Sequence, residues 1–538
     1  MGRPQSWNIA IAAALFLSLA VASFAPIRSY DYFWHLATGR WIADHRELPR
    51  ADPFTVGSDT EVWHNGEWLF QVALYPIFRA GGHEAVAVAR GLIVAAIFTL
   101  GFLFARSHAA TSLAFLLTVI CWYGAKERLD ARPSTVAALF VVLALIILFS
   151  RSGSPKTRAI LYALLTAVWM NAHPSALLAP ALAGIYYAGR MLGETADRRA
   201  LLKEGGWMGS AAVAGLLANP YGVEGILAPV RLVGRIGEGH FVNAEWLPSL
   251  PTIFPLLYVT LVVGALLFIT RPKDRGMMAQ AFLFILFAWM SVRYVRNQGL
   301  YFAALPILLA PLLPMTIRPR IRTAALAAGV ILLLSVATGA SLTPAVDPNT
   351  YPVRAAAELE RVGLKGNIYN PDQFGGFLSW TFYPERRVLI DGRNELHDTV
   401  IREYAVARLD SRAWDAMIQK YELTLAVDEY HRETMTMVDA VTGEQREMPS
   451  SLIYFPPARW ALIAFDDVGM VFARRDAYPP DLLEAIELRH LVPDDPQAVR
   501  RLTPEELLVA RRDLASSVRR FGAGRVTGAL VEELSRTR

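Results

Sequence analysis

The sequence predicts an α-helical polytopic membrane protein of about eleven spanning helices, followed by a soluble α/β domain. Of the 538 residues, 54% are hydrophobic and 19% are charged, against roughly 45–50% and about 25% in soluble globular chains. Apolar runs follow one another up to residue 344, and ordinary soluble composition begins at residue 345. We therefore expect two parts, a membrane part and a soluble part.

The membrane part contains eleven apolar runs, each close to the roughly 17–25 residues of a spanning helix once its flanks are included. They lie near 8–27, 86–105, 109–124, 134–150, 159–170, 174–189, 207–219, 252–270, 277–292, 299–316 and 323–342. The first run is as long as a span and no small-residue cleavage site follows it. We expect it to be a retained helix rather than a signal peptide.

Alternate short connections between these runs are basic, which predicts the orientation. Their basic side chains are Arg106; Arg151, Lys156 and Arg158; Arg190, Arg198, Arg199 and Lys203; Arg271, Lys273 and Arg275; and Arg318, Arg320 and Arg322. Lys and Arg accumulate in cytoplasmic loops, so the N-terminus is predicted in the cytoplasm and the soluble part on the opposite side of a bacterial inner membrane. The net charge of +5 then belongs to a protein whose partner is the lipid bilayer, and no nucleic-acid partner is expected.

Three domains follow from these observations. Residues 1–344 form the predicted membrane domain, with a long first outside loop at 28–82; residues 345–479 form a soluble extracytoplasmic α/β domain, and residues 480–538 a charged, peripheral helical tail. Within the α/β domain, helices are expected near 355–362, 374–383, 398–408 and 413–420, and strands near 366–369, 387–390, 423–427, 460–465 and 469–474. The last two strands should form a hairpin.

Histidines, carboxylates and arginines gather in the predicted outside segments. Asp31 and His35 are four residues apart and His64 and Glu67 three apart, so each pair would share one face of a helix. Further along lie Arg128, Arg132, His173, Arg293 and Arg296. Charged groups near the hydrocarbon boundary are costly unless they are paired or face a wet cavity. Their concentration on one side predicts a reaction centre there.

These residue types suit phosphate chemistry. Arginines bind phosphate bidentately, and a carboxylate can deprotonate an acceptor, so Asp31 and Glu67 are the candidate catalytic residues. The other residues of the set are candidates for substrate binding: His35, His64, Arg128, Arg132, His173, Arg293 and Arg296. Alternatives stay open, since the arginines could anchor the interface and His173 could serve a helix end. No cofactor is certain, although Asp31, His35, His64 and Glu67 could together hold a divalent cation.

Aromatic residues of the first loop and one turn of the soluble part complete the candidates. Trp34, Trp63 and Trp68 are predicted to belong to an interfacial aromatic belt, and the amphipathic stretch Trp68–Phe78 to form a helix lying in the interface. Asp391 and Arg393 flank Gly392 after the predicted strand 387–390. Strand ends are where α/β sheets place ligand groups, but the same sequence also forms an ordinary turn.

The segment Asp31-Tyr-Phe-Trp-His35 directly after the first span, with His64-Asn-Gly-Glu67-Trp68 later in the same loop, resembles the GT-C superfamily of membrane glycosyltransferases. The resemblance implies many spans, a soluble domain outside, and polyprenyl-phosphate sugars as donors. A closer similarity, over nearly the whole chain, is to a bacterial membrane family with the segments Asp31–Trp41, Asn219–Gly222 and Asp391–Arg393. Many GT-C members pair two acidic residues early in this loop. Here Asp31 acts alone, or Asp52 or Glu67 supplies the second carboxylate, or the transferase activity has been lost.

The predicted function is transfer of a sugar from a polyprenyl-phosphate donor to an acceptor at the extracytoplasmic face. Asp31 would act as base or metal-positioning carboxylate with Glu67 assisting, and Arg132, Arg293 and Arg296 would hold the leaving lipid phosphate. The alternatives are a non-enzymatic protein that binds lipid-linked glycans or assembles the envelope, and an oligosaccharide ligase or polymerase. The sequence contains no P-loop, dinucleotide fingerprint, HExxH or GxSxG motif, which argues against an ATP-driven pump or a serine hydrolase. It carries no signal of oligomeric state.

Overall fold

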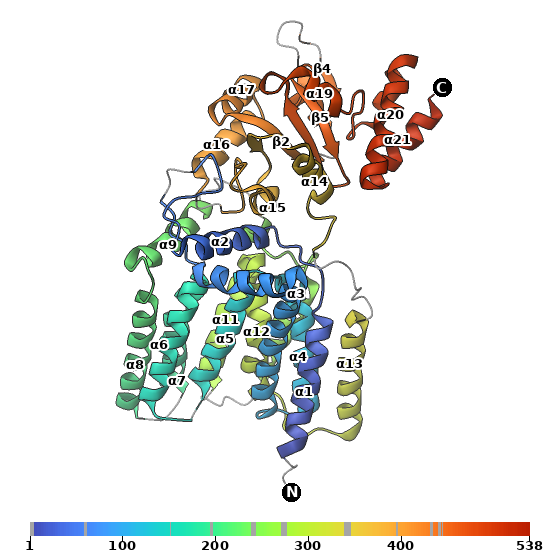
Figure 1. The fold of residues 1–538 in the computed structure, drawn as a ribbon. Coiled ribbons are helices and arrows are strands. Elements are labelled where there is room, and N and C mark those ends of the chain that lie inside the picture. The colour runs from blue at the N-terminus through green and yellow to red at the C-terminus, as the bar shows by residue number, and fades with distance from the viewer. Residues whose placement is uncertain are drawn as a thin grey trace. The chain divides into compact units, whose positions relative to one another are not determined.

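The computed structural model describes residues 5–58, 62–150, 152–193, 197–237, 244–270, 277–337, 346–393, 396–430, 434–438, 443 and 445–537. The chain divides into two compact units (Figure 1). The helical unit comprises Met1–Ser29, Thr38–Leu48 and His64–Val346, and the α/β unit comprises Tyr30–Ala37, Pro49–Trp63 and Asp347–Arg538. Two segments of the first loop therefore fold with the soluble part, whereas the sequence analysis assigned the whole loop to the membrane part.

Each of the eleven predicted apolar runs is occupied by a helix in the helical unit. The helices are α1 (Gln5–Ala22), α3 (Trp68–Arg106), α4 (Thr111–Ala125), α5 (Pro133–Phe149), α6 (Pro155–Ala172), α7 (Leu178–Gly193), α8 (Arg198–Leu217), α10 (Pro255–Thr270), α11 (Met278–Arg293), α12 (Gln298–Leu309) and α13 (Pro319–Ala337). Their buried side chains form one large apolar cluster, which includes residues of α1, α3, α5, α7 and α12. An additional amphipathic helix, α9 (Val223–Gly237), was not predicted.

Two of the described helices are individually long and apolar enough to cross a membrane, Trp68–Arg106 and Pro319–Val336. Shorter apolar helices lie at Ile9–Ala22, Pro133–Phe149, Pro255–Thr270 and Met278–Arg293. The crossing of the membrane by all eleven helices stays a prediction. Of the basic residues that predict the orientation, Arg151, Arg271, Lys273 and Arg275 lie outside the described residues.

Helix α3 combines two predicted features. Its backbone leaves the helical conformation at Gly81 and Gly82, and Gly82 has a φ of 67°, which suits glycine because it lacks a Cβ. The part before this break contains the predicted amphipathic helix, and the part after it contains the predicted span. The helical conformation of Trp68–Phe78 is thus confirmed, while its position in a membrane interface stays a prediction.

The α/β unit is built on a four-stranded sheet of order β1-β2-β6-β5. Strands β1 (Asn367–Tyr369) and β2 (Leu423–Glu429) are parallel, and β6 (Gly469–Arg474) is antiparallel to both β2 and β5 (Trp460–Phe465). The predicted β5–β6 hairpin is confirmed. A second, two-stranded sheet of β3 (Met435–Val438) and β4 (Gln445–Met448) was not predicted.

The predicted strand at 387–390 forms single bridges on both of its sides. Val388 is bridged to Ile368 of β1 and to Thr55 of the first loop. Val56 donates a backbone hydrogen bond of 2.9 Å to Val388, and Val388 one of 3.2 Å to Phe54. The first loop thereby adds an extended segment beside the edge of the sheet.

The predicted helices of this unit are also present, within about three residues of their expected bounds. They are α14 (Val353–Val362), α15 (Asp372–Phe382), α16 (Asp398–Ala407) and α17 (Ser411–Lys420). The C-terminal tail is helical, with α19 (Pro480–Ile486), α20 (Pro504–Phe521) and α21 (Arg525–Arg536). Its apolar side chains, such as Leu507 and Leu530, join the same core cluster as Leu423 of β2, so the tail is part of the folded unit rather than peripheral to it.

Candidate functional site

Three arginines of the helical unit surround one carboxylate, and together they form the arginine cluster (Arg128, Arg132, Glu245 and Arg296). Arg132 precedes α5, Arg128 lies in the short helix η1 (Lys126–Arg128), and Glu245 lies in η3 (Ala244–Trp246). Glu245 Oε1 is 2.7 Å from Arg132 Nη1 and 3.5 Å from Arg128 Nη1. The guanidinium of Arg296 lies 4.4 Å from the centre of the Trp246 ring.

Backbone hydrogen bonds hold Glu245 beside the turn between α11 and α12. Val295 donates to the Leu247 carbonyl (3.0 Å), and Ser249 donates to the Val292 carbonyl (3.0 Å). Burial alone would raise the pKa of Glu245, but Arg132, Arg296 and Arg128 hold the pKa of this carboxyl below its usual range. Glu245 is therefore ionised at neutral pH and fixes the three arginines around it.

His173 and Glu67 extend the arginine cluster. His173 ends α6, and its Nδ1 accepts a hydrogen bond from the Ser175 backbone N–H (3.0 Å). The proton of the neutral ring must then be on Nε2, which lies 3.8 Å from Glu67 Oε1. Burial, with Arg296 and Arg132, lowers the pKa of His173 to about 3. The ring is therefore neutral at physiological pH, and the two arginines make the potential around it positive.

His64 and Glu67 do not share a helical face, because both precede the start of α3; that prediction was wrong. The loop that carries them is held by Trp68, whose Nε1 donates to Asn171 Oδ1 (2.8 Å). The His64 ring lies edge-on to Tyr221, with 5.4 Å between the ring centres. Arg293, at the end of α11, is exposed and lies 4.8 Å from the ring centre of Tyr294.

The segment Asn219–Gly222 forms a tight turn, and its Tyr221 contacts His64. Asn219 Nδ2 donates to the carbonyls of Leu216 and Gly222, at 2.8 and 2.9 Å. Gly222 has a φ of 56°, a conformation that favours glycine. The turn holds Tyr221 beside Trp68 and Asn171 in a shallow crevice. Glu245, Trp246 and Tyr221 were missed as site residues, although an acidic-aromatic pair in an outside segment was a signal that could have indicated the first two.

In the α/β unit, Asp31 is the first residue of helix α2 (Asp31–His45), so the predicted helical spacing of Asp31 and His35 is confirmed. The Trp34 Nε1 donates to Asp31 Oδ1 at 3.3 Å. A Cβ built on Gly392 would lie 2.8 Å from the same oxygen. His35 is buried, with its ring centre 3.6 Å from that of Trp34. The structure therefore brings Asp31 beside the turn that carries the other two candidates, Asp391 and Arg393.

Asp391 and Arg393 belong to a buried ion network, the Arg393 cluster (Asp52, Ser58, Asp391, Arg393 and His397). Arg393 Nη2 is 2.5 Å from Asp391 Oδ2 and 2.9 Å from Asp52 Oδ1, and all three side chains are 0% exposed. His397 lies with Nε2 3.0 Å from Asp391 Oδ1 and Nδ1 2.6 Å from Ser58 Oγ. Burial opposes ionisation of Asp391, but Arg393 and His397 hold the pKa of this carboxyl far below its usual range. In this arrangement Asp391 and Arg393 hold a turn together, and a direct role in substrate binding stays a prediction.

The guanidinium of Arg393 is enclosed by aromatic rings. Its centre lies 4.6 Å from the Trp63 ring centre, 5.3 Å from that of Phe54 and 5.8 Å from that of Trp34. Trp34 and Trp63 are 5% and 2% exposed. Their assignment to an interfacial belt was wrong, because both rings pack around a buried cation instead.

The four candidate metal ligands fall in different units, Asp31 and His35 in the α/β unit and His64 and Glu67 in the helical unit. Within the parts of the chain that the structure describes, no three His, Cys, Asp or Glu side chains come together as a metal site. A divalent cation therefore stays a prediction.

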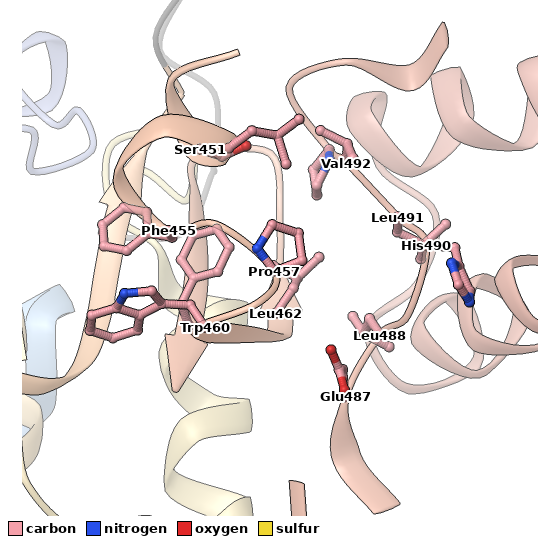
Figure 2. Close-up of a pocket in the computed structure, with 13 residues that line it drawn as sticks. Ser451, Phe455, Pro457, Trp460, Leu462, Glu487, Leu488, His490, Leu491 and Val492 are labelled. Atoms are coloured by element: carbon pink, nitrogen blue, oxygen red, sulfur yellow. The ribbon is translucent and has the colours of Figure 1, made fainter. Parts of the chain in front are cut away.

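The α/β unit also contains a pocket of ≈ 150 Å³ between the β5–β6 hairpin and the segment 487–493 (Figure 2). Phe455, Trp460 and Leu488 are among the apolar side chains that line it. Two of its polar groups are already paired, Glu487 with Arg475 and Ser451 with Asp494. Neither Lys nor Arg is among the side chains that line this pocket, so it suits an apolar group better than a phosphate.

No known family model and no curated protein sequence matches this chain. Among solved structures, the oligosaccharyltransferase of Archaeoglobus fulgidus in its apo form matches with a TM-score of 0.59 and 10% identity, over 98% of this chain and 86% of the other. The chain has the GT-C fold. A second GT-C structure, the archaeal oligosaccharyltransferase AglB from the same organism in complex with an inhibitory peptide and a dolichol-phosphate, matches with a TM-score of 0.56 and 10% identity over 97% and 84%.

A third GT-C structure, the A. fulgidus oligosaccharyltransferase in complex with Zn and sulfate, gives a TM-score of 0.52 and 12% identity over 97% and 84% of the two chains. These matches confirm the GT-C resemblance that the sequence suggests, at the level of the fold. One fold can support many activities, so the reaction that this chain carries out depends on its own side chains.

Proposed function

We propose that this protein transfers a sugar from a polyprenyl-phosphate donor to an acceptor at the extracytoplasmic face of the bacterial inner membrane. The observation that carries the proposal is the convergence of Arg128, Arg132 and Arg296 on Glu245. Guanidinium groups match the geometry of phosphate oxygens. The solved structures that share the fold are oligosaccharyltransferases, one of them in complex with a dolichol-phosphate, which is consistent with a reaction that uses a lipid phosphate.

In this proposal the arginine cluster acts on the leaving group. As the bond between the anomeric carbon and the phosphate oxygen breaks, its electron pair goes to the lipid phosphate, whose negative charge grows. Donors that are already oriented stabilise such a charge without reorganising. Glu245 helps to keep Arg132 in place, because its Oε1 lies 2.7 Å from Arg132 Nη1, and its carboxylate also interacts electrostatically with Arg296.

The carboxylates act on the acceptor. An acceptor hydroxyl attacks the anomeric carbon from the face opposite the leaving phosphate, and its proton passes to Asp31, the proposed general base. A single displacement of this kind inverts the configuration. Glu67 assists, and Nε2 of neutral His173 lies 3.8 Å from its Oε1. His64 and Arg293 are proposed to contact the donor or acceptor outside the arginine cluster, and His35 to support Asp31.

The test uses the purified full-length protein with radiolabelled polyprenyl-phosphate hexoses, with and without a divalent cation and a chelator. Arg132→Gln should weaken donor binding about 10–100-fold, since it removes one partner of a desolvated charge contact. The matched control is Arg318→Gln, at an exposed arginine of the connection between α12 and α13, which should bind the donor like the natural protein. Asp31→Asn should bind the donor normally but turn it over at least about 100-fold more slowly.

Three results would contradict this assignment. Tight donor binding without turnover under any condition would favour a protein that binds lipid-linked glycans. Transfer only from lipid-linked oligosaccharides would favour a ligase or polymerase. Unchanged turnover in Asp31→Asn would remove Asp31 from the mechanism.

A further inference from the structure

The turn that contains Gly392, after the 387–390 segment, lies against the side chain of Asp31. A side chain at position 392 would bring its Cβ to 2.8 Å from Asp31 Oδ1 and to 3.5 Å from Trp34 Nε1. Real Cβ atoms essentially never approach another atom below 3.0 Å. Because the contacted atom is the end of a side chain, an added Cβ at position 392 would displace the Asp31 carboxylate rather than the backbone.

Helix α15 joins these two elements through a pair of glycines. A Cβ on Gly375 would lie 1.9 Å from the Ile390 carbonyl oxygen and 2.7 Å from Asp391 Cα. A Cβ on Gly376 would lie 3.1 Å from the backbone N of Trp34 and 3.1 Å from the Tyr30 oxygen. The backbones of the start of α2, the start of α15 and the turn thus approach one another closely at Gly375 and Gly376.

Arg393 fixes the turn from its other side. Its guanidinium connects Asp391 in the turn to Asp52 of the first loop, and His397 connects Asp391 to Ser58. Ser58, His397 and Asp391 form a hydrogen-bonded series, but each is at most 1% exposed, so the serine is not accessible as a nucleophile. The network ties two distant segments around the turn.

Trp34 supplies a second connection. Its ring is one of the aromatic groups around Arg393, and its Nε1 is the donor to Asp31. Replacing a buried ion network with apolar residues is often neutral or stabilising. Stability alone is therefore a weak reason for placing Arg393 and two aspartates here, whereas fixing one geometry is a stronger one.

We propose that Arg393, held by Asp52 and Asp391, is a positioning residue for Asp31: through Gly392 and Trp34 it sets where the Asp31 carboxylate lies and how it is solvated. Its catalytic consequence rests on the proposed function, in which Asp31 is the base. The placement of Asp31 by Arg393 does not depend on the proposed function.

The experiment compares three variants of the full-length protein in detergent. Gly392→Ala places a methyl group against Asp31 and leaves the ion network intact, and the Gly392 backbone has no positive φ that would strain alanine. Arg393→Lys keeps the charge but loses the planar fork that reaches both aspartates. Arg386→Lys is the matched control, because Arg386 is also buried in this unit and paired with Glu360 (3.1 Å) and the Leu364 carbonyl (2.6 Å).

The first readout is the rate at which a carbodiimide and an amine label the Asp31 carboxyl, measured by peptide mass spectrometry across pH 5–8. Labelling of Asp31 should change at least about 3-fold in Gly392→Ala and Arg393→Lys and stay unchanged in Arg386→Lys. If Asp31 is labelled alike in Gly392→Ala and the natural protein, the proposal is overturned. This readout needs no activity, and Gly392→Ala keeps the test valid should Arg393→Lys fold poorly.

The second readout is sugar transfer. Misplacement of a reacting group by about 1 Å can cost about 100-fold in rate, so kcat should fall about 10-fold or more in both variants while the donor KM stays unchanged. A purely structural role would lower the yield and thermal midpoint of Arg393→Lys and Arg386→Lys alike, with kcat per folded molecule unchanged. Altered labelling in a protein that transfers no sugar would support the positioning of Asp31 and refute the proposed function.

Discussion

Replacing Arg393 by methionine tests how the α/β unit tolerates its most buried cation. Methionine has a similar length but no charge, so Asp52 and Asp391 are left at 0% exposure without their shared guanidinium. Removing one partner of a buried ion pair costs about 3–5 kcal/mol. In a unit of this size, about 1 kcal/mol corresponds to about 2–4 °C. The midpoint of thermal unfolding should therefore fall by about 6–20 °C.

The destabilisation caused by Arg393→Met should depend on pH, and the direction of this dependence follows from the pKa of Asp391. In the natural protein the pKa of Asp391 is depressed, chiefly because Arg393 and His397 outweigh burial. A depressed folded-state pKa stabilises the fold above the unfolded value of about 3.9 and loses that contribution as pH falls through the folded pKa. In Arg393→Met burial dominates and raises the pKa of Asp391. Protonation of Asp391 then removes its unpaired buried charge. The loss in thermal midpoint of Arg393→Met, relative to the natural protein, should therefore be largest near pH 8 and become smaller towards pH 5.

The assay is the thermal midpoint of the detergent-solubilised protein at several pH values, with Asp52→Asn added to form a double-variant cycle. Asp52→Asn should restore part of the midpoint in the Arg393→Met background and lower it in the natural one. The control Arg459→Met removes an exposed pair with Asp415, which should cost no more than about 1 kcal/mol. A deficit for Arg393→Met equal to that of the control, or one that grows towards acid pH, would refute the reasoning.

Two further predictions concern the helical unit. His173 is neutral because its pKa is about 3, so His173→Gln should change the level of sugar transfer but not the shape of its pH profile between pH 5 and 8; a lost ionisation step in that range would contradict this. Gly222→Ala should destabilise the protein by about 1 kcal/mol or more because φ is 56° there. Gly206→Ala, in helix α8 with open space around the new methyl, should leave the thermal midpoint unchanged or raise it slightly. Equal thermal midpoints for Gly222→Ala and Gly206→Ala would contradict the strain predicted at Gly222.

The positions of the helices could be predicted from the sequence because each apolar run is a local property. The break in α3 at Gly81 and Gly82 and the β5–β6 hairpin are equally local, since glycine and the Asp466-Asp467 turn mark them. Helix ends were less accurate. The first turns of α8 carry Arg198, Arg199 and Lys203, so the apolar pattern began later than the helix does.

Pairings between distant segments could not be predicted. Ser58 and His397 are 339 positions apart, and no periodicity connects them. The same limit explains the error at Trp34 and Trp63. Aromatic residues near a predicted membrane boundary have the composition of an interfacial belt, and only the tertiary structure shows that they surround Arg393.

The two charged clusters differ in the ratio of positive to negative groups and in exposure. Around Arg393, two aspartates and a histidine match one guanidinium, and the central side chains are 0% exposed. Around Glu245, three arginines act on one carboxylate, and the side chains of Arg132 and Glu245 keep 14% and 27% of their exposure. An anion entering the Arg393 cluster would have to displace two carboxylates and three aromatic rings of low exposure. An anion reaching the arginine cluster meets three guanidinium groups against one carboxylate, and Arg296 and Arg132 contribute, after burial, to the low pKa of His173. Charge ratio and exposure therefore support the proposal that the lipid phosphate binds at the arginine cluster, and they favour a structural role for Arg393 over direct phosphate binding.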